Sequence, residues 1–345
     1  MKKIIVFITI LIVHTWFPYK TMAAETPDVE SKAAIVLDVK TGEVLYEKNA
    51  HRRMYPASLT KVATAIYAIE KGNLDDIVTI SKNARQVEGT RVYLEEGEKV
   101  PLRKLIQGLL INSGNDAGVA IAEHLDGSIG KFAENLNEYL SNIGLQNTNF
   151  ENPHGLFDSE HLTTAGDLAI VTQYAMKNEE FMKIFGTTEL DWEGESWDTT
   201  LFTHHKLMRE RPYDGVTGGK TGYIDQSGHT LLTTAERGNT SFIVVTLGGS
   251  SQEMAYEDTT TLLDYAFLHY KTTTIPKGTT FNSKGSVYTA TKDYYFTQSS
   301  DQTAKMESAK RDYEGFEGYI SSFTFMSLAA LSIFFLKHTR RKYIR

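Results

Sequence analysis

Cysteine is absent from this chain of 345 residues, which excludes disulfides, a thiol nucleophile and a cysteine-ligated metal. Apolar residues make up 41% and charged residues 23% of the chain. That balance is typical of a folded globular protein and argues against global disorder. The length allows one large domain or two average ones, and we find no internal repeat.

Basic residues are scarce in the central part of the chain. Of the 36 Lys and Arg residues, three lie in residues 1–24 and five in residues 337–345, and neither segment carries an acid. The remaining 28 basic residues stand against 43 acidic ones, a net charge of −15. An acidic body disfavours polyanionic partners, so we expect no binding to nucleic acid.

The N-terminus has the pattern of a secretory signal. Two lysines precede a ten-residue apolar run at 4–13, and the small residues Ala23 and Ala24 follow. Ten apolar residues are too few to span a bilayer, so the pattern predicts a signal peptide over residues 1–24. An uncleaved N-terminal anchor is the alternative.

The C-terminal region has the pattern of a membrane span. Residues 318–336 contain no charged side chain. A helix of that length, at about 1.5 Å per residue, nearly covers a hydrocarbon core of about 30 Å. Acidic residues precede it and the basic segment 337–345 follows, which places that tail in the cytoplasm. We expect a single transmembrane helix that tethers an exported body to the membrane. An interfacial or buried helix is the alternative, because five Ser and Thr residues weaken the span.

The body between these segments is predicted to alternate strands and helices. Apolar alternation and turn residues predict strands over 33–38, 43–47, 229–235 and 241–247. Apolar periodicity and helix-end signals predict helices over 58–71, 102–111, 116–125, 164–176 and 252–270. Strands at both ends with helices between them predict an α/β (α+β) fold. We expect a mixed antiparallel sheet flanked by helices, in which early strands pair with late ones.

Two domain boundaries follow from composition. Residues 25–270 are predicted to form the catalytic domain. Residues 271–317 are rich in Thr, Ser, Lys and Asp and poor in Leu. So short a stretch is small for an independent core, and we interpret it as a stalk with room for a small β-structure.

A serine and a lysine at the start of a predicted helix are candidates for nucleophilic catalysis. Ser58 and Lys61 are three residues apart, which places the hydroxyl and the amine on one helix face. The helix N-terminus also directs unpaired N–H groups toward the serine. A lysine acts as a base only when burial or a neighbouring cation lowers its pKa, and Lys220 is the candidate for that cation. The pair predicts a serine nucleophile with a lysine base.

The order of three short motifs separates the candidate set from chance matches. Ser-x-x-Lys, Ser-x-Asn and Lys-Thr-Gly also occur at 128–131, 81–83 and 40–42. The segments 58–61, 113–115 and 220–222 follow one another along the chain, whereas no Ser-x-Asn follows Ser128.

The ordered motifs resemble those of the penicillin-binding proteins and serine β-lactamases. The closer resemblance is to the low-molecular-mass D-alanyl-D-alanine carboxypeptidases, and it covers residues 30–270. It is carried by the segments 55–61, 110–117, 150–156, 161–168 and 219–223. The resemblance implies the penicillin-binding-protein-like transpeptidase fold. It also implies an enzyme that needs neither metal nor cofactor and removes the terminal D-Ala of peptidoglycan stem peptides.

The resemblance also implies catalytic roles. Ser58 would be the acyl-enzyme nucleophile and Lys61 its general base, while Ser113 would relay protons to the leaving amine. β-Lactams would acylate the same serine.

Five further residues would bind the substrate. Asn115 would orient the peptide amide, Lys220 would hold a positive potential, and Thr221 would bind the terminal carboxylate. The backbone N–H groups of the serine nucleophile and of Tyr223, next to Gly222, would form the oxyanion hole.

The chain departs from the family pattern in two places. Members carry a β-rich domain after the catalytic one, where this chain has only the predicted stalk. Many members also place an arginine several residues after the pair Gly248 and Gly249, and none follows here. We therefore expect carboxylate binding to depend on Thr217, Thr221 and Lys220.

Other interpretations remain open. Ser58 is also a common type of helix cap, and Ser113 a common turn residue. A serine β-lactamase would need a deacylating carboxylate such as Glu151 or Glu160. A non-catalytic wall-binding or β-lactam-sensing protein would bind its ligand without turnover.

The histidines suggest a triad or a metal site as further alternatives. His204 and His205 are adjacent, and neighbours rarely share one ligand direction. His154 and His161 lie in a predicted loop. For all four we expect structural hydrogen bonds and no metal.

Overall fold

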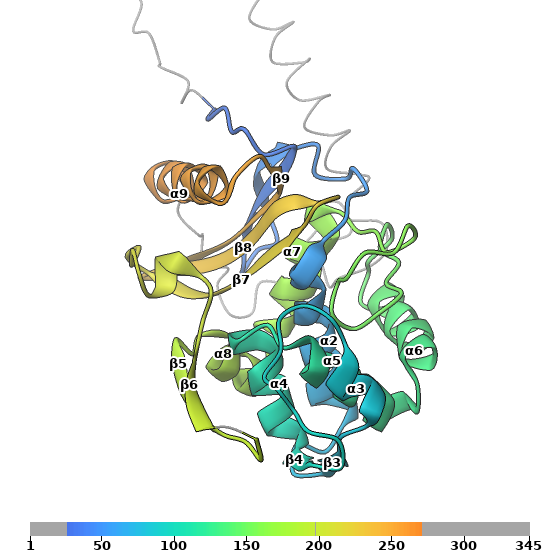
Figure 1. Cartoon of the computed structure of the whole chain (residues 1–345). Coiled ribbons are helices and arrows are strands. Elements are labelled where there is room, and N and C mark those ends of the chain that lie inside the picture. The colour runs from blue at the N-terminus through green and yellow to red at the C-terminus, as the bar shows by residue number, and fades with distance from the viewer. Residues whose placement is uncertain (1–25, 197, 271–345) are drawn as a thin grey trace, which may run out of the picture. The chain divides into compact units, whose positions relative to one another are not determined.

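The computed structural model describes residues 26–196 and 198–270 (Figure 1). The predicted signal peptide, stalk, transmembrane helix and basic tail lie outside these described residues. Within the described part of the chain, no helix is both long enough and apolar enough to cross a membrane.

A five-stranded sheet with the strand order β2-β1-β9-β8-β7 forms one side of the domain. Its strands are β1 (Ala33–Asp38), β2 (Val44–Lys48), β7 (Val216–Ile224), β8 (Gly228–Arg237) and β9 (Thr240–Gly249). The predicted pairing of early with late strands is confirmed, because β1 lies beside β9 with Ala33 opposite Leu247. The predicted antiparallel sheet is also confirmed, since every pairing in this sheet is antiparallel.

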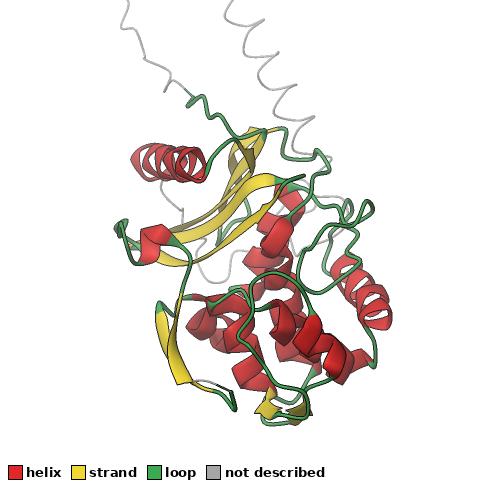
Figure 2. Cartoon of the chain, in the orientation of Figure 1, coloured by secondary structure: helices red, strands yellow, loops and turns green. Residues whose placement is uncertain are grey.

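The rest of the described chain consists of helices, two small two-stranded sheets and the loops that connect them (Figure 2). The helices are η1 (Ala57–Leu59), α2 (Thr60–Lys71), α3 (Lys82–Gln86), α4 (Leu102–Ile111), α5 (Asn115–Asp126), α6 (Ile129–Asn142), α7 (Ala165–Ala175), α8 (Glu179–Phe185), η2 (Lys206–Met208) and α9 (Gln252–His269). Two small two-stranded sheets pair β3 (Ile77–Thr79) with β4 (Lys99–Pro101), and β5 (Glu189–Glu193) with β6 (Asp198–Phe202). The five predicted helices are confirmed, whereas α3, α6, α8 and both two-stranded sheets were not predicted.

The sheet is buried on both faces. Ile35 and Leu37 of β1 pack into the large core formed with the central helices. Ala34 and Val36 point the other way, into a second core beneath α9. This alternation follows from the two-residue period of a strand, and α9 is seen on the outer face of the sheet in Figure 1. Both faces of the sheet are therefore covered, and the edge strand β7 lies next to the helical part of the domain.

The Lys-Thr-Gly motif lies inside β7, a strand that was not predicted. The glycines at 218, 219 and 222 lower strand propensity and obscured this strand in the sequence. Strand β7 contacts η1, so the third motif lies beside the first.

Candidate active site

Ser58 lies in η1, a tight turn that leads directly into α2. The preceding residue, Ala57, has a φ of 50°, a left-handed conformation that is uncommon for a residue with a side chain. The Thr60 hydroxyl donates to the Ala57 carbonyl at 2.9 Å, and Thr230 donates to the Pro56 carbonyl at 3.0 Å. A Cβ at Gly155 would collide with that Ala57 carbonyl. The turn that presents Ser58 is therefore held from both sides.

Lys61 is fully buried and its amine lies at the centre of the site. The Nζ atom donates to Ser58 Oγ at 2.9 Å, to Asn115 Oδ1 at 2.7 Å and to the His154 carbonyl at 2.7 Å. Burial lowers the pKa of Lys61 well below its usual value, and the charge of Lys220 lowers it further. The charge of Asp116 acts in the opposite direction. Burial and Lys220 are the two causes that the sequence analysis named.

The Ser-x-Asn motif forms the turn between α4 and α5. Ser113 has a φ of 63° and is 4% exposed, and it lines the same cavity as Ser58. Asn115 accepts from the lysine amine through Oδ1, while its Nδ2 donates to the Glu88 carbonyl at 2.7 Å. The amide orientation is thus fixed at both ends.

The Lys-Thr-Gly motif lies against the nucleophile turn. Lys220 is buried, donates to the Thr221 carbonyl at 2.8 Å, and has its pKa lowered by burial to about 7. A Cβ at Gly222 would lie 2.8 Å from the Ser58 nitrogen. Glycine at this position therefore lets the backbone of β7, with Tyr223 next in line, approach the serine N–H.

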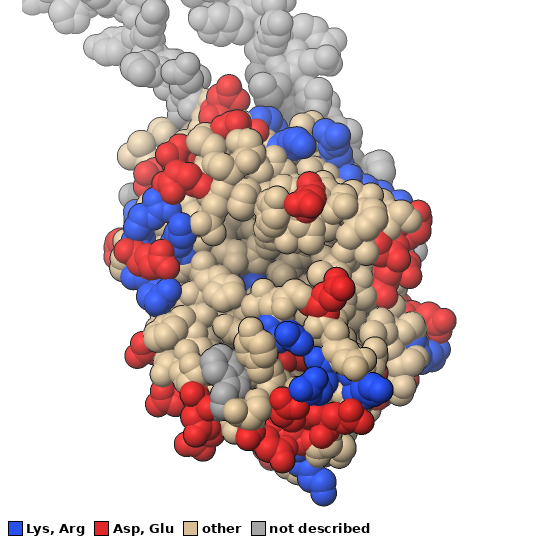
Figure 3. Space-filling model, in the orientation of Figure 1, with Lys and Arg blue, Asp and Glu red and all other residues tan. Residues whose placement is uncertain are grey.

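A cavity of about 370 Å³ opens above these residues. Its described lining consists of Ser58, Thr90, Ser113, His204, Thr221, Gly222, Tyr223, His229, Thr230, Leu231, Gln252, Ala255 and Tyr256. Figure 3 shows a hollow near the middle of this face, bordered mainly by uncharged atoms. Apart from Thr217, the sequence-predicted site residues either line the cavity or hydrogen-bond to a residue that lines it.

Several lining residues were not predicted from the sequence. Thr90, His204 and Tyr256 belong to no motif, and only the folded chain brings them together. Gln252 and Tyr256 begin α9, the segment in which the family arginine is missing. Thr217 was expected to bind carboxylate, but it pairs with Thr234 at 2.8 Å and is not among the described lining residues.

The buried histidines make structural hydrogen bonds. His161 Nδ1 accepts from the Glu151 N–H at 3.0 Å, so its Nε2 carries the proton that faces the Thr60 hydroxyl at 2.8 Å. Burial lowers the pKa of His161 to about 4, which keeps the ring neutral. His205 is also buried, with Nε2 2.8 Å from the Thr233 hydroxyl. Within the described part of the chain, no group of three or more His, Asp or Glu residues is placed to hold a metal ion.

The geometry agrees with a comparison against protein families. Residues 20–251 match the family described as D-alanyl-D-alanine carboxypeptidase, the peptidase family S11. This chain belongs to that family. The sequence resemblance to the low-molecular-mass penicillin-binding proteins is thereby confirmed.

Curated members of the family cover most of the described domain. D-alanyl-D-alanine carboxypeptidase DacF of Bacillus subtilis is 36% identical over 248 residues, which cover 70% of this chain and 64% of the relative. DacA of Escherichia coli is 31% identical over 273 residues, which cover 73% and 64%. The matched part of this chain thus spans less than two thirds of either relative.

Solved structures share the fold. Penicillin-binding protein 6B from Escherichia coli has a TM-score of 0.69 at 30% identity, covering 75% of this chain and 84% of that structure. A mutant of the Streptomyces K15 DD-transpeptidase has a TM-score of 0.67 at 27% identity, covering 70% of this chain and all of that structure. The α/β fold of the penicillin-binding proteins is therefore confirmed for the described domain.

The two carboxylates considered as deacylating groups of a β-lactamase are not among the described residues that line the cavity. Glu151 is exposed and accepts from Asn149 at 2.7 Å. Neither Glu151 nor Glu160 belongs to the described lining of the cavity.

Proposed function

We propose that this protein is a serine-type D-Ala-D-Ala carboxypeptidase that removes the terminal D-Ala from peptidoglycan stem peptides. The observation that supports this most directly is the buried contact between Lys61 Nζ and Ser58 Oγ at 2.9 Å. The lowered pKa of Lys61 makes its neutral amine available. In that form the Ser58 hydroxyl donates to the lone pair of the Lys61 nitrogen. Family membership supports the same substrate class.

The acylation step follows from this contact. Ser58 Oγ attacks the carbonyl carbon of the penultimate D-Ala, and Lys61 accepts the hydroxyl proton. The carbon–nitrogen bond then breaks, and Ser113 passes a proton to the leaving amine of the terminal D-Ala. Water hydrolyses the resulting ester and regenerates Ser58. A β-lactam carbonyl would form the equivalent ester with the same oxygen.

The neighbouring residues hold the substrate and the developing charge. The N–H groups of Ser58 and Tyr223 face the oxyanion, which the close approach of Gly222 permits. Lys220 and the Thr221 hydroxyl attract the terminal carboxylate, in the absence of the family arginine.

A labelling experiment tests this function. The full chain in detergent is incubated with a labelled penicillin and, separately, with a D-Ala-D-Ala peptide. We expect a stable adduct on the tryptic peptide that contains Ser58, and release of free D-Ala. Turnover of penicillin faster than of the peptide would indicate a β-lactamase. Binding of the peptide without D-Ala release would indicate a non-catalytic wall-binding protein.

We further propose the topology predicted from the sequence. The signal peptide over residues 1–24 would export the catalytic domain, and the helix over 318–336 would hold it at the outer face of the membrane. External protease on intact cells should then release the folded domain by cutting within 271–317. Digestion of a tag placed after Arg345, with the domain protected, would show the opposite orientation.

A further inference from the structure

Tyr93 has an unusual backbone conformation and an exposed ring. Its φ is 59°, which is uncommon for a residue with a bulky side chain. The side chain is nevertheless 52% exposed and fills no core. Strained residues that neither turn the chain tightly nor pack inside often mark functional positions.

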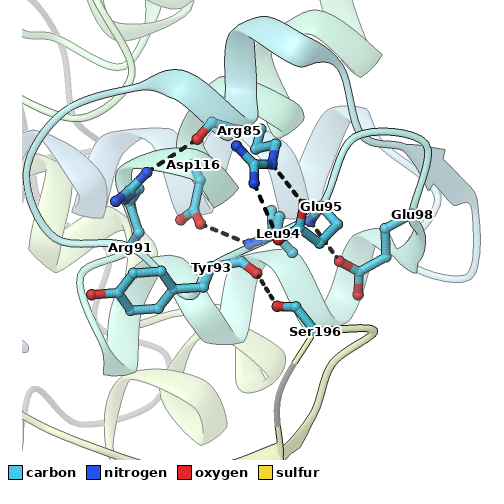
Figure 4. A network of polar contacts seen from close by, with 8 residues as sticks. All are labelled: Arg85, Arg91, Tyr93, Leu94, Glu95, Glu98, Asp116 and Ser196. Carbon is cyan, nitrogen blue, oxygen red and sulfur yellow. Dashed lines mark hydrogen bonds and ion pairs between the residues drawn. The ribbon is translucent and has the colours of Figure 1, made fainter.

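A network of hydrogen bonds holds Tyr93 in this conformation (Figure 4). The buried carboxylate of Asp116 accepts from the Val92 N–H at 3.0 Å and from the Leu94 N–H at 3.1 Å, on both sides of the tyrosine. The Ser196 hydroxyl donates to the Tyr93 carbonyl at 3.0 Å. The strained residue is therefore held by two separate parts of the fold, α5 and the segment between β5 and β6.

Arg91 lies on the tyrosine ring. Its guanidinium carbon is 5.1 Å from the ring centroid of Tyr93, and its Nη1 donates to the Arg85 carbonyl at 3.2 Å. Arg85 itself forms an ion pair with Glu95 at 2.6 Å. For Arg91 there is no carboxylate within ion-pair distance in the described part of the chain. An arginine without a carboxylate partner in the described part of the chain is thus held against an aromatic ring.

This pair directly follows a residue of the active-site cavity in the chain. Thr90, the residue before Arg91, lines the cavity and accepts from the Asn115 N–H at 2.7 Å. Asn112, the residue before Ser113, donates to the Arg91 carbonyl at 2.9 Å. In Figure 3 basic side chains gather below the hollow, on a protein whose body is otherwise acidic.

We propose that Arg91 and Tyr93 form a subsite that binds a carboxylate of the substrate peptide upstream of its D-Ala-D-Ala end. This proposal rests on the proposed function and adds a preference for acidic peptides. A guanidinium binds a carboxylate through two parallel hydrogen bonds, and the ring beneath it fixes the guanidinium plane.

Two matched peptides test the subsite. Both end in D-Ala-D-Ala and carry an upstream γ-linked D-glutamyl residue, whose α-carboxylate is free in one peptide and amidated in the other. With the full chain, we expect kcat/KM to favour the free carboxylate by about fivefold, the scale of a partly exposed charged hydrogen bond. Arg91→Gln should reduce this ratio to near one. Lys99→Gln removes an exposed cation on β4, outside the cavity lining, and should leave the ratio unchanged.

A second variant separates binding from folding. Glycine adopts a positive φ without strain, so Tyr93→Gly should keep or raise Tm while lowering the substrate ratio. Equal kcat/KM for the two peptides in the parent, or a ratio that survives Arg91→Gln, would overturn the subsite alone. If neither peptide is hydrolysed and penicillin labels no serine, the proposed function fails and the subsite fails with it.

Discussion

Two segments of this protein share the pattern Ser-x-x-Lys and differ in every physical respect. Ser58 follows the left-handed residue Ala57 in η1, and the amine of the fully buried Lys61 lies 2.9 Å from its hydroxyl. Ser128 is the N-cap of α6, and its hydroxyl accepts from the Lys131 backbone N–H at 3.2 Å. The Lys131 amine points to solvent and pairs with Glu134 at 2.9 Å.

The difference shows that the environment, not the spacing, makes a lysine basic. Burial lowers the pKa of Lys61, whereas the hydrogen bond that Lys131 donates to Glu134 raises the pKa of Lys131. Only Lys61 has a second buried lysine nearby. The same four-residue pattern is therefore a candidate active site in one place and a helix cap in the other.

Replacing each of the two serines by alanine should give the largest difference in activity between the two segments. Ser58→Ala removes the nucleophile and should abolish both the penicillin adduct and D-Ala release. Ser128→Ala removes a helix cap, which costs about 1 kcal/mol, and should only lower Tm by about 2–4 °C. Adduct mass, D-Ala release and calorimetry measure these effects. A Ser58→Ala protein that still forms the adduct would remove the distinction.

Substitution of the two lysines should give nearly as large a contrast. Arginine does not deprotonate in proteins, so Lys61→Arg keeps a cation but loses the base. We expect acylation to slow by about 10³-fold, within the range of general-base catalysis, while Lys131→Arg acylates as the parent does. In the parent, acylation should rise as pH passes upward through the lowered pKa of Lys61, because only the neutral amine accepts a proton. Parent-like acylation by Lys61→Arg would exclude Lys61 as the base, and His154 or His229 would need to be reconsidered.

Replacing a glycine by alanine in each region should give a smaller difference in acylation rate than the serine and lysine variants do. A Cβ at Gly222 would lie 2.8 Å from the Ser58 nitrogen, so Gly222→Ala should disturb the oxyanion N–H groups and slow acylation about 10²-fold. Gly130 in α6 has open space around its Cα, and Gly130→Ala should stabilise the helix by up to about 1 kcal/mol. Stopped-flow acylation and urea unfolding compare the two. Unchanged acylation in Gly222→Ala would show that β7 does not need this close approach.

The helices and the choice between the two Ser-x-x-Lys segments were predictable from the sequence, whereas strand β7 and part of the cavity lining were not. Helix α4 begins and ends where apolar periodicity placed it, and the order of the motifs selected 58–61 over 128–131. Strand β7 was missed because its glycines carry no apolar alternation. Thr90 and Tyr256 meet at the cavity only through long-range packing, which no local pattern records.

The smallest effect we predict concerns the charge that Lys61 has nearby and Lys131 lacks. Burial lowers the pKa of Lys220 to about 7, so it carries a proton mainly below that pH, and its charge then lowers the pKa of Lys61. Lys220→Met removes this charge, so the pKa of Lys61 should rise and less neutral amine should be present. At saturating penicillin, acylation should fall by up to about tenfold below pH 7, the equivalent of one pKa unit.

The same reasoning predicts how the acylation rate depends on pH above pH 7. Above pH 7 the parent also loses the Lys220 charge, so its limiting acylation rate and that of Lys220→Met should converge. Lys220→Arg is the matched control, since it keeps the cation and should follow the parent below pH 7. Because the limiting rate at saturation excludes binding, weaker capture of the penicillin carboxylate by Lys220→Met does not contribute to the difference. A Lys220→Met profile that coincides with the parent below pH 7, or moves to lower pH, would mean that burial alone separates Lys61 from Lys131.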